Sequence, residues 1–321
     1  MPLRVAVQMD PLEKINISGD STFAIMMKAQ ELGHTLYHYA PEDLSWAEGR
    51  LWTMGYPVSV QRVEGDHYHF GEPRILDLGR DVDVVLMRQD PPFDLGYITA
   101  THLLERIKDE TLVVNDPAAV RNAPEKLWVL DFAQFMPPTA ITRSLGLARK
   151  FLAEHADIVV KPLHGFAGGS VFRIGQDGRN LASLMELFNR TYREPHVLQK
   201  FLPEITKGDK RIVLVDGQVA GAVNRVPGEA EIRSNLAVGG TAAKTELSEG
   251  EREICTVLGP ECTKRGLLFV GIDVIGGRWL TEINVTSPTG IVSIDKFNGT
   301  DTPGLIWEAI ERRLKERLAT S

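Results

Sequence analysis

The sequence has 321 residues, of which 43% are hydrophobic and 25% are charged, as is ordinary for a globular protein. Its formal net charge of −7, with no block of lysines or arginines, argues against a nucleic-acid partner. No apolar run approaches the roughly 20 residues needed to cross a bilayer, and the first residues lack a signal-peptide pattern, so we expect a cytoplasmic protein without a membrane segment.

The first third of the sequence alternates between strand-like and helix-like segments. Asp20 or Ser21 provides an N-cap for a helix that ends before Gly33. Such alternation favours an α/β domain built on a largely parallel sheet, which we place at residues 1–123. Strands are predicted at residues 3–9, 34–39, 58–63, 67–70, 82–87 and 112–115, and helices at residues 21–32 and 97–108.

One polar stretch of this domain, M-R-Q-D-P-P-F-D at residues 87–94, directly follows a predicted strand. Functional residues collect at the carboxyl ends of strands in parallel sheets, which makes this stretch a candidate functional segment. The alternative is a loop that is merely stiffened by its two prolines.

A second candidate site follows the polar, proline-containing segment 116–125, where we place a domain boundary. Lys126 comes immediately after this segment, and Lys161 ends a strand that leads into the glycine-rich loop 162–169. Glycines let backbone amides approach phosphate oxygens, and a lysine adds a point charge. The loop is neither a Walker loop nor a dinucleotide fingerprint, and an ordinary turn is the alternative.

The next segments carry further charged residues. Residues 197–203 are predicted to form a strand and hinge, and residues 208–217 a strand that ends in an Asp-Gly turn, with Asp209 and Arg211 at its start. Residues 224–247 contain glycines and show little periodicity. Long loops of this kind are usually functional or disordered, and the cations in this one suggest a lid over an anion. These cations and their neighbouring amide are Arg225, Arg233, Asn235 and Lys244.

Two apolar runs at residues 269–275 and 280–285 flank a pair of glycines, which predicts a hairpin. If residues 276–279 form the loop, Asp273 lies opposite Glu282, and Asn284 shares a face with Glu282. Hard cations such as Mg²⁺ prefer carboxylate and amide oxygens of this kind. The alternative is a half-exposed hairpin with a solvated polar face.

Cys255 and Cys262 are the two cysteines of the sequence. On one helix they would lie roughly 10 Å apart, too far for a disulfide. We therefore expect two buried, reduced thiols.

The order of these motifs resembles that of the ATP-grasp ligases. The segment D-V-I…T-E-I-N-V-T-S-P-T-G and the N-terminal M-D-P…K-I-N-I…D-S-T-F are most similar to bacterial glutathione synthetases. The resemblance implies a mixed α/β ATP-grasp fold with an N-terminal parallel α/β domain at residues 1–123, a central subdomain at 124–202 and a C-terminal catalytic subdomain at 203–321.

The resemblance also implies roles for individual residues. Arg211 and Arg233 would be catalytic. Asp273, Glu282 and Asn284 would hold Mg²⁺, with Mn²⁺ as an alternative. ATP would contact Lys126, Lys161, Gly165, Gly168, Gly169, Gln199, Lys200, Leu202 and Asp209, and the substrates would contact Arg88, Arg225, Asn235, Thr286, Ser287, Pro288 and Thr289.

The implied reaction joins glycine to γ-glutamylcysteine with ATP, through an acyl phosphate, in a homo-oligomer (dimer or tetramer). One alternative is an ATP-grasp ligase that adds glutamate to the C-terminus of a peptide or protein. Another is a non-catalytic ATP-binding protein of the same fold, such as a synapsin. A nicotinamide-dependent dehydrogenase is a weaker alternative, because the dinucleotide fingerprint is missing.

Overall fold

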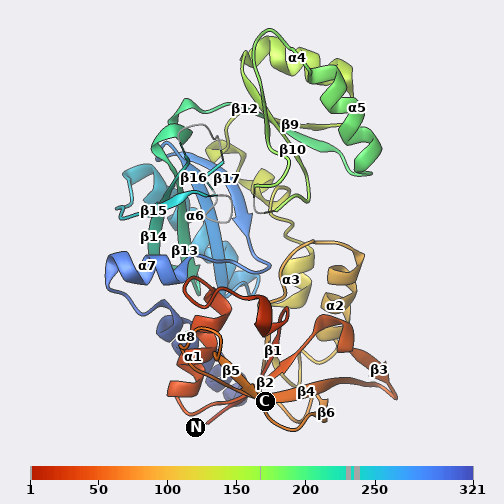
Figure 1. Cartoon of the computed structure of the whole chain (residues 1–321), viewed down its shortest axis with the longest axis vertical. Helices are drawn as coiled ribbons and strands as arrows, with labels where there is room; N and C mark the ends of the chain where they lie inside the picture. The colour runs from red at the N-terminus through yellow and green to blue at the C-terminus, as the bar shows by residue number, and fades with distance from the viewer. Residues whose placement is uncertain (1, 167, 229–232, 235–238, 321) are drawn as a thin grey trace.

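The computed structural model describes residues 2–166, 168–228, 233–234 and 239–320. They form three tiers, each built around one sheet, and both ends of the described chain lie in the lowest tier (Figure 1). In the lowest tier, four strands are parallel, in the order β2-β1-β7-β8. These strands and the neighbouring helices are β1 (Arg4–Gln8), α1 (Ser21–Glu31), β2 (Thr35–Tyr39), β7 (Val84–Met87), α2 (Leu95–Glu105), β8 (Leu112–Val114) and α3 (Pro117–Arg121).

The expectation of a largely parallel sheet is wrong for the other half of this tier. Residues 50–60 form one long strand, β4 (Arg50–Val60), which pairs antiparallel with β2 and three short strands. Glu48 and Gly49 both have positive φ, as a two-residue hairpin turn requires. That turn reverses the chain locally, so no crossover helix is needed. The short strands are β3 (Ser45–Ala47), β5 (Tyr68–Phe70) and β6 (Arg74–Asp77).

The uppermost tier has a four-stranded sheet in the order β11-β10-β12-β9, with two helices packed on it (Figure 1). It has a hydrophobic core of its own, which includes Leu152, Val160 and Phe188. The glycine-rich loop connects β10 to β11. The elements are β9 (Thr139–Thr142), α4 (Leu145–His155), β10 (Ile158–Pro162), β11 (Phe172–Ile174), α5 (Leu181–Thr191) and β12 (His196–Lys200).

The middle tier is an antiparallel sheet in the order β15-β14-β13-β16-β17. Asp216 and Gly217, both with positive φ, form the predicted turn between β13 and β14. Ser248 and Glu251 form a capping box at the start of α6. The elements are β13 (Asp209–Val215), β14 (Gln218–Val226), β15 (Thr241–Ala243), α6 (Glu249–Lys264), β16 (Phe269–Ile275), β17 (Trp279–Asn284) and α7 (Ile291–Asn298).

The predicted loop at 224–247 is therefore shorter than expected. Its first residues belong to β14 and residues 241–243 form β15, which pairs with β14. Residues 229–232 and 235–238, eight of the 24 residues of the predicted lid, lie outside the described part of the chain.

Polar contacts join the lowest tier to the middle tier. The Asn115 amide donates to the carbonyls of Phe269 and Val285 at 2.8 and 2.9 Å and accepts from the Phe269 amide. The last helix, α8 (Thr302–Thr320), packs on α1. Trp307 of α8 is fully buried, and its indole donates to the Ile25 carbonyl. The boundaries at 123/124 and 202/203 stay predictions.

Two further expectations from the sequence can be compared with the structure. Cys255 and Cys262 are free and buried, as expected, and burial raises the pKa of both thiols to about 12. Across the described residues, no helix is both long enough and apolar enough to span a membrane.

We predict that Trp307→Ala lowers the free energy of unfolding by about 3–5 kcal/mol, because it opens a cavity and removes a hydrogen bond between α8 and α1. Leu318→Ala, on the same helix at a side chain that is 78% exposed, should change it by less than about 0.5 kcal/mol. Urea unfolding followed by circular dichroism measures both values. Equal effects would show that the α8–α1 contact contributes little.

Candidate active site

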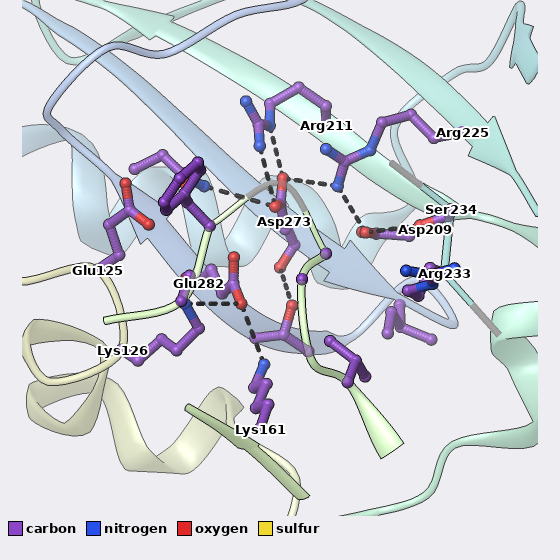
Figure 2. A pocket seen from close by; sticks show the side chains of 18 of the residues that line it. Glu125, Lys126, Lys161, Asp209, Arg211, Arg225, Arg233, Ser234, Asp273 and Glu282 are labelled. Atoms are coloured by element: carbon purple, nitrogen blue, oxygen red, sulfur yellow. Dashed lines mark hydrogen bonds and ion pairs between the residues drawn. The ribbon is translucent and has the colours of Figure 1, made fainter. Parts of the chain in front are cut away.

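A cavity of about 420 Å³ lies between the sheets of the middle and upper tiers. Its walls come from β10, the glycine-rich loop and β12 on one side, and from β13, β14, β16 and β17 on the other. The turn 286–290 and the segment before Lys126 complete the lining. Residues predicted from separate parts of the sequence thus share one cavity (Figure 2).

The hairpin of β16 and β17 supplies the predicted metal ligands. Asp273 lies opposite Glu282, as predicted. The next pair is Val274 with Leu280, so Thr281 is an extra residue in β17, and its hydroxyl donates to the Asp273 carbonyl. This bulge keeps Asp273 and Glu282 paired although the connecting loop is short.

Asp273 is buried and paired with two arginines. Arg211 donates to both carboxylate oxygens, at 2.6 and 3.0 Å, and Arg225 lies 3.0 Å from Oδ1. Arg225 also lies 2.5 Å from Asp209, whose Oδ2 accepts from the Ser234 hydroxyl at 3.0 Å.

These contacts shift the pKa values of the two aspartates in opposite directions. Burial favours the protonated form of Asp273, but Arg211 and Arg225 outweigh it and hold the pKa of that carboxyl well below its usual range. Burial raises the pKa of Asp209 to about 6, with Arg225 opposing the shift.

Glu282 pairs with the two predicted nucleotide lysines. Its Oε1 lies 3.1 Å from the Lys161 ammonium and 3.5 Å from that of Lys126. Burial opposes ionisation, yet these two cations lower the pKa of Glu282. Lys126 also donates to the Gly165 carbonyl at 2.5 Å, which ties it to the glycine-rich loop.

The oxygen donors fit a hard divalent cation. Asp273 and Glu282 supply carboxylates on one face of the hairpin. The amide nitrogen of Asn284 is turned toward the Gly271 carbonyl and Asp273, so its amide oxygen is the atom left for a cation. Within the described ranges, no group of three or more His, Cys, Asp or Glu residues could hold a metal. A metal here would therefore need the amide and non-protein ligands as well.

The turn 286–290 is fixed to the N-terminal tier. Arg88 donates to the Pro288 carbonyl at 2.9 Å, Ser287 donates to the Arg88 carbonyl, and the Gly290 amide donates to the Ser21 hydroxyl. The structure thus brings together two segments that were predicted separately for the substrate.

Most of the other predicted residues also line the cavity. Arg88 and Pro288 lie behind its wall, and Asn235 lies outside the described residues. Gln199, Lys200 and Leu202 border it on the upper side. The lining also contains Gly165, Gly168, Gly169, Arg225, Arg233, Thr286, Ser287 and Thr289.

Comparison with known proteins identifies the family. The profile of the N-terminal domain of prokaryotic glutathione synthetase matches residues 3–121, and that of its ATP-grasp domain matches residues 125–299. The glutathione synthetase of Rhodopseudomonas palustris is 56% identical over 313 residues, covering 98% of this chain and 99% of the relative. That of Yersinia pestis is 41% identical over 320 residues, covering 99% and 100%.

This chain belongs to the prokaryotic glutathione synthetase family. Among solved structures, D-cycloserine synthetase DcsG is similar with a TM-score of 0.66 at 18% identity, covering 97% of this chain and 99% of that chain. The ATP-grasp ligase PsnB complexed with precursor peptide PsnA2 and AMPPNP has a TM-score of 0.60 at 18% identity, covering 97% and 98%. The predicted ATP-grasp fold of this family member is confirmed.

Four polar residues that line the cavity, among the described residues, were not predicted as site residues: Asp90, Glu125, Ser234 and Thr281. Glu125 precedes Lys126 in the sequence, and its side-chain Oε1 accepts from the Thr286 hydroxyl at 3.1 Å. A carboxylate beside a candidate nucleotide lysine was the signal that could have identified it.

We predict that Arg225→Gln destabilises the protein by about 3–5 kcal/mol at pH 8, because it leaves Asp209 and Asp273 buried without their shared cation. The loss should be smaller at pH 5. A carboxyl whose folded pKa is raised binds protons more tightly when folded, so stability falls as pH rises through that pKa. Urea unfolding at both pH values measures this. Arg190→Gln, at a side chain that is 78% exposed, is the control and should show no such pH dependence.

Proposed function

We propose that this protein uses ATP to join glycine to γ-glutamylcysteine, giving glutathione, ADP and phosphate. The observation that carries the proposal is the single cavity in which Asp273, Glu282 and Asn284 meet Lys126, Lys161 and Arg211. This cavity lies in a chain that matches glutathione synthetases over 98% of its length. The predicted enzyme class, an ATP-dependent ligase, is confirmed by the family.

The residue types fit phosphoryl transfer to a carboxylate. A carboxylate is a poor electrophile, so it must first become an acyl phosphate. Arg211 holds its guanidinium beside Asp273 and the turn at Thr289, where it can stabilise charge that develops on the transferred phosphoryl group. Lys126 and Lys161 would bind phosphate oxygens of ATP. No side-chain nucleophile is required.

The family uses a divalent metal ion together with ATP. We propose Mg²⁺, with Mn²⁺ as an alternative, held by Asp273, Glu282 and Asn284. When bound, such an ion would neutralise negative charge on the phosphate groups during transfer.

We place the cysteinyl carboxylate beside the turn 286–290 and the rest of the dipeptide toward Arg88. Buried Nη1 of Arg88 has no hydrogen-bond partner among the described residues, and such a donor suits a substrate oxygen. Arg225 and Arg233 line the opposite side of the cavity, where they would face anionic groups.

We also propose that the protein works in the cytoplasm as a homo-oligomer, a dimer or tetramer. The two free, buried thiols support the cytoplasm as the compartment, because its reducing conditions keep cysteines unpaired. Exposed apolar side chains on the N-terminal sheet, Trp46, Met54 and Ile75, support association. Light scattering after gel filtration would give the mass, and a monomer would contradict this proposal.

We predict that the purified protein forms glutathione from ATP, γ-glutamylcysteine and glycine, and that ¹⁸O in the cysteinyl carboxylate appears in inorganic phosphate. The acyl phosphate requires this transfer, because the labelled oxygen bridges carbon and phosphorus before it leaves. Mass spectrometry of the phosphate measures it. Release of ADP without glutathione, or transfer of glutamate to a peptide, would support the rival functions instead.

We predict that Glu282→Gln and Asn284→Ala keep the fold but reduce turnover by roughly a thousandfold, since several kcal/mol of transition-state stabilisation depend on the cation. Both variants should also bind Mn²⁺ more weakly in the presence of a non-hydrolysable ATP analogue, as measured by electron paramagnetic resonance. Lys150→Ala, at an exposed residue of α4 that does not line the cavity, should leave Mn²⁺ binding unchanged. Near-normal activity of both variants at saturating metal would rule out the ligand assignment.

A further inference from the structure

The proposed reaction needs a proton acceptor that the residues assigned so far do not provide. At neutral pH the amine of glycine is an ammonium group without a lone pair. It must lose a proton before its nitrogen can attack an acyl phosphate. A positioned general base typically contributes 10²–10⁴-fold to such a step.

Five carboxylates line the cavity among the described residues, and three of them are held in ion pairs. Asp209 pairs with Arg225, Asp273 with Arg211, and Glu282 with two lysines. A carboxylate held against a cation is a poor acceptor for the ammonium group of glycine, because the cation repels that group. Asp90 and Glu125 are the other two.

Glu125 is held in place from two directions. Its backbone carbonyl accepts from the Ile283 amide at 3.2 Å, which attaches it to the strand of the metal ligands. Its Oε1 accepts from the Thr286 hydroxyl at 3.1 Å, which attaches it to the turn proposed to receive the substrate carboxylate. Because Oε1 is already engaged, Oε2 is the atom available to a donor in the cavity. Asp90, by contrast, lies on an exposed loop.

Figure 2 shows Glu125 beside Lys126, on the side of Glu282 away from Arg225 and Arg233. Withdrawal from water raises the pKa of the Glu125 carboxyl, Lys126 and Arg211 oppose the shift, and Glu282 adds to it. The buried phenol of Tyr97 also lies within electrostatic reach. The hydrogen bond from Thr286 also opposes the shift, but the net change in the pKa of Glu125 is upward, which makes it a better proton acceptor than an ordinary glutamate.

We propose, resting on the function proposed above, that Glu125 is a catalytic residue that takes the proton from the attacking amine of glycine. One proton passes from the glycine ammonium to Glu125 Oε2, and the nitrogen lone pair then forms the bond to the acyl carbon. The carbon–oxygen bond to phosphate breaks, and phosphate leaves with the electron pair. The second proton of the new C–N centre goes to the departing phosphate, and Glu125 returns its proton to solvent.

The test compares glycine with hydroxylamine, a nucleophile that is largely unprotonated at pH 7 and needs no base. For Glu125→Gln we expect glutathione formation at pH 7 to fall about 100-fold, while ATP-dependent hydroxamate formation from γ-glutamylcysteine stays within about threefold of the wild type. Glutathione formation by this variant should recover to within about tenfold by pH 9, where more glycine is neutral. Asp90→Asn is the matched control, because Asp90 is the other cavity carboxylate that is not held in an ion pair.

Each outcome bears on a different statement. Equal loss of glutathione and hydroxamate in Glu125→Gln would show that Glu125 only positions Thr286 or the phosphoryl-transfer site, and would overturn the proposal. A selective loss of glutathione in Asp90→Asn, without one in Glu125→Gln, would move the base to Asp90. A wild-type protein that makes neither product would refute the proposed function itself.

Discussion

The site depends on a set of buried charges that the register of one antiparallel sheet brings together. Asp209 is opposite Arg225 on β14, Arg211 is opposite Asp273 on β16, and Asp273 is opposite Glu282 on β17. The first two pairs join opposite charges. The third joins two carboxylates, and cations on both sides neutralise them: Arg211 and Arg225 for Asp273, and Lys126 and Lys161 for Glu282. Buried ions are tolerated only when each has partners, so a one-residue slip in any of these strands would expose or isolate a charge. The strand register brings the charges into pairs, and the cost of an unpaired buried charge in turn favours this register over a shifted one.

The charges of the residues joined by these ion pairs do not sum to zero. Four cations, Arg211, Arg225, Lys126 and Lys161, face three carboxylates, so the described cluster is positive overall. The excess charge suits a polyanion. The two lysines come from the segment before the upper tier and from the upper sheet itself, whereas Glu282 belongs to the middle tier. Lys161 and Glu282 are 121 positions apart and still meet. Their ion pair holds the two walls of the cavity together, and a polyphosphate would compete for the same lysines.

Local patterns in the sequence predicted much of this arrangement. Two apolar runs around a pair of glycines predicted the hairpin, and a loop at 276–279 placed Asp273 opposite Glu282. The loop is in fact 276–278, and the pair is kept because Thr281 is an extra residue in β17. What local pattern could not show were pairings between distant segments. Nothing near residue 50 indicates that β4 pairs antiparallel with β2, and nothing near Asp273 indicates two arginine partners. Glu125 had a local signal, its position beside Lys126, but its contact with Thr286, 161 positions away, is another pairing that local pattern could not show.

The choice of acceptor substrate depends on a different part of the molecule from the charge network. The middle and upper tiers and the segment between the N-terminal and upper tiers supply the cavity lysines, the cavity arginines and the proposed metal ligands, and structures that share this fold at 18% identity include a ligase complexed with a precursor peptide. The turn 286–290, however, is tied to Arg88 and Ser21 of the N-terminal tier. A substrate whose carboxylate lies at this turn must extend toward that tier. With the carboxylate placed there, as proposed, the N-terminal tier would set the length and charge of the acceptor, and the antiparallel sheet would supply the groups that activate its carboxylate.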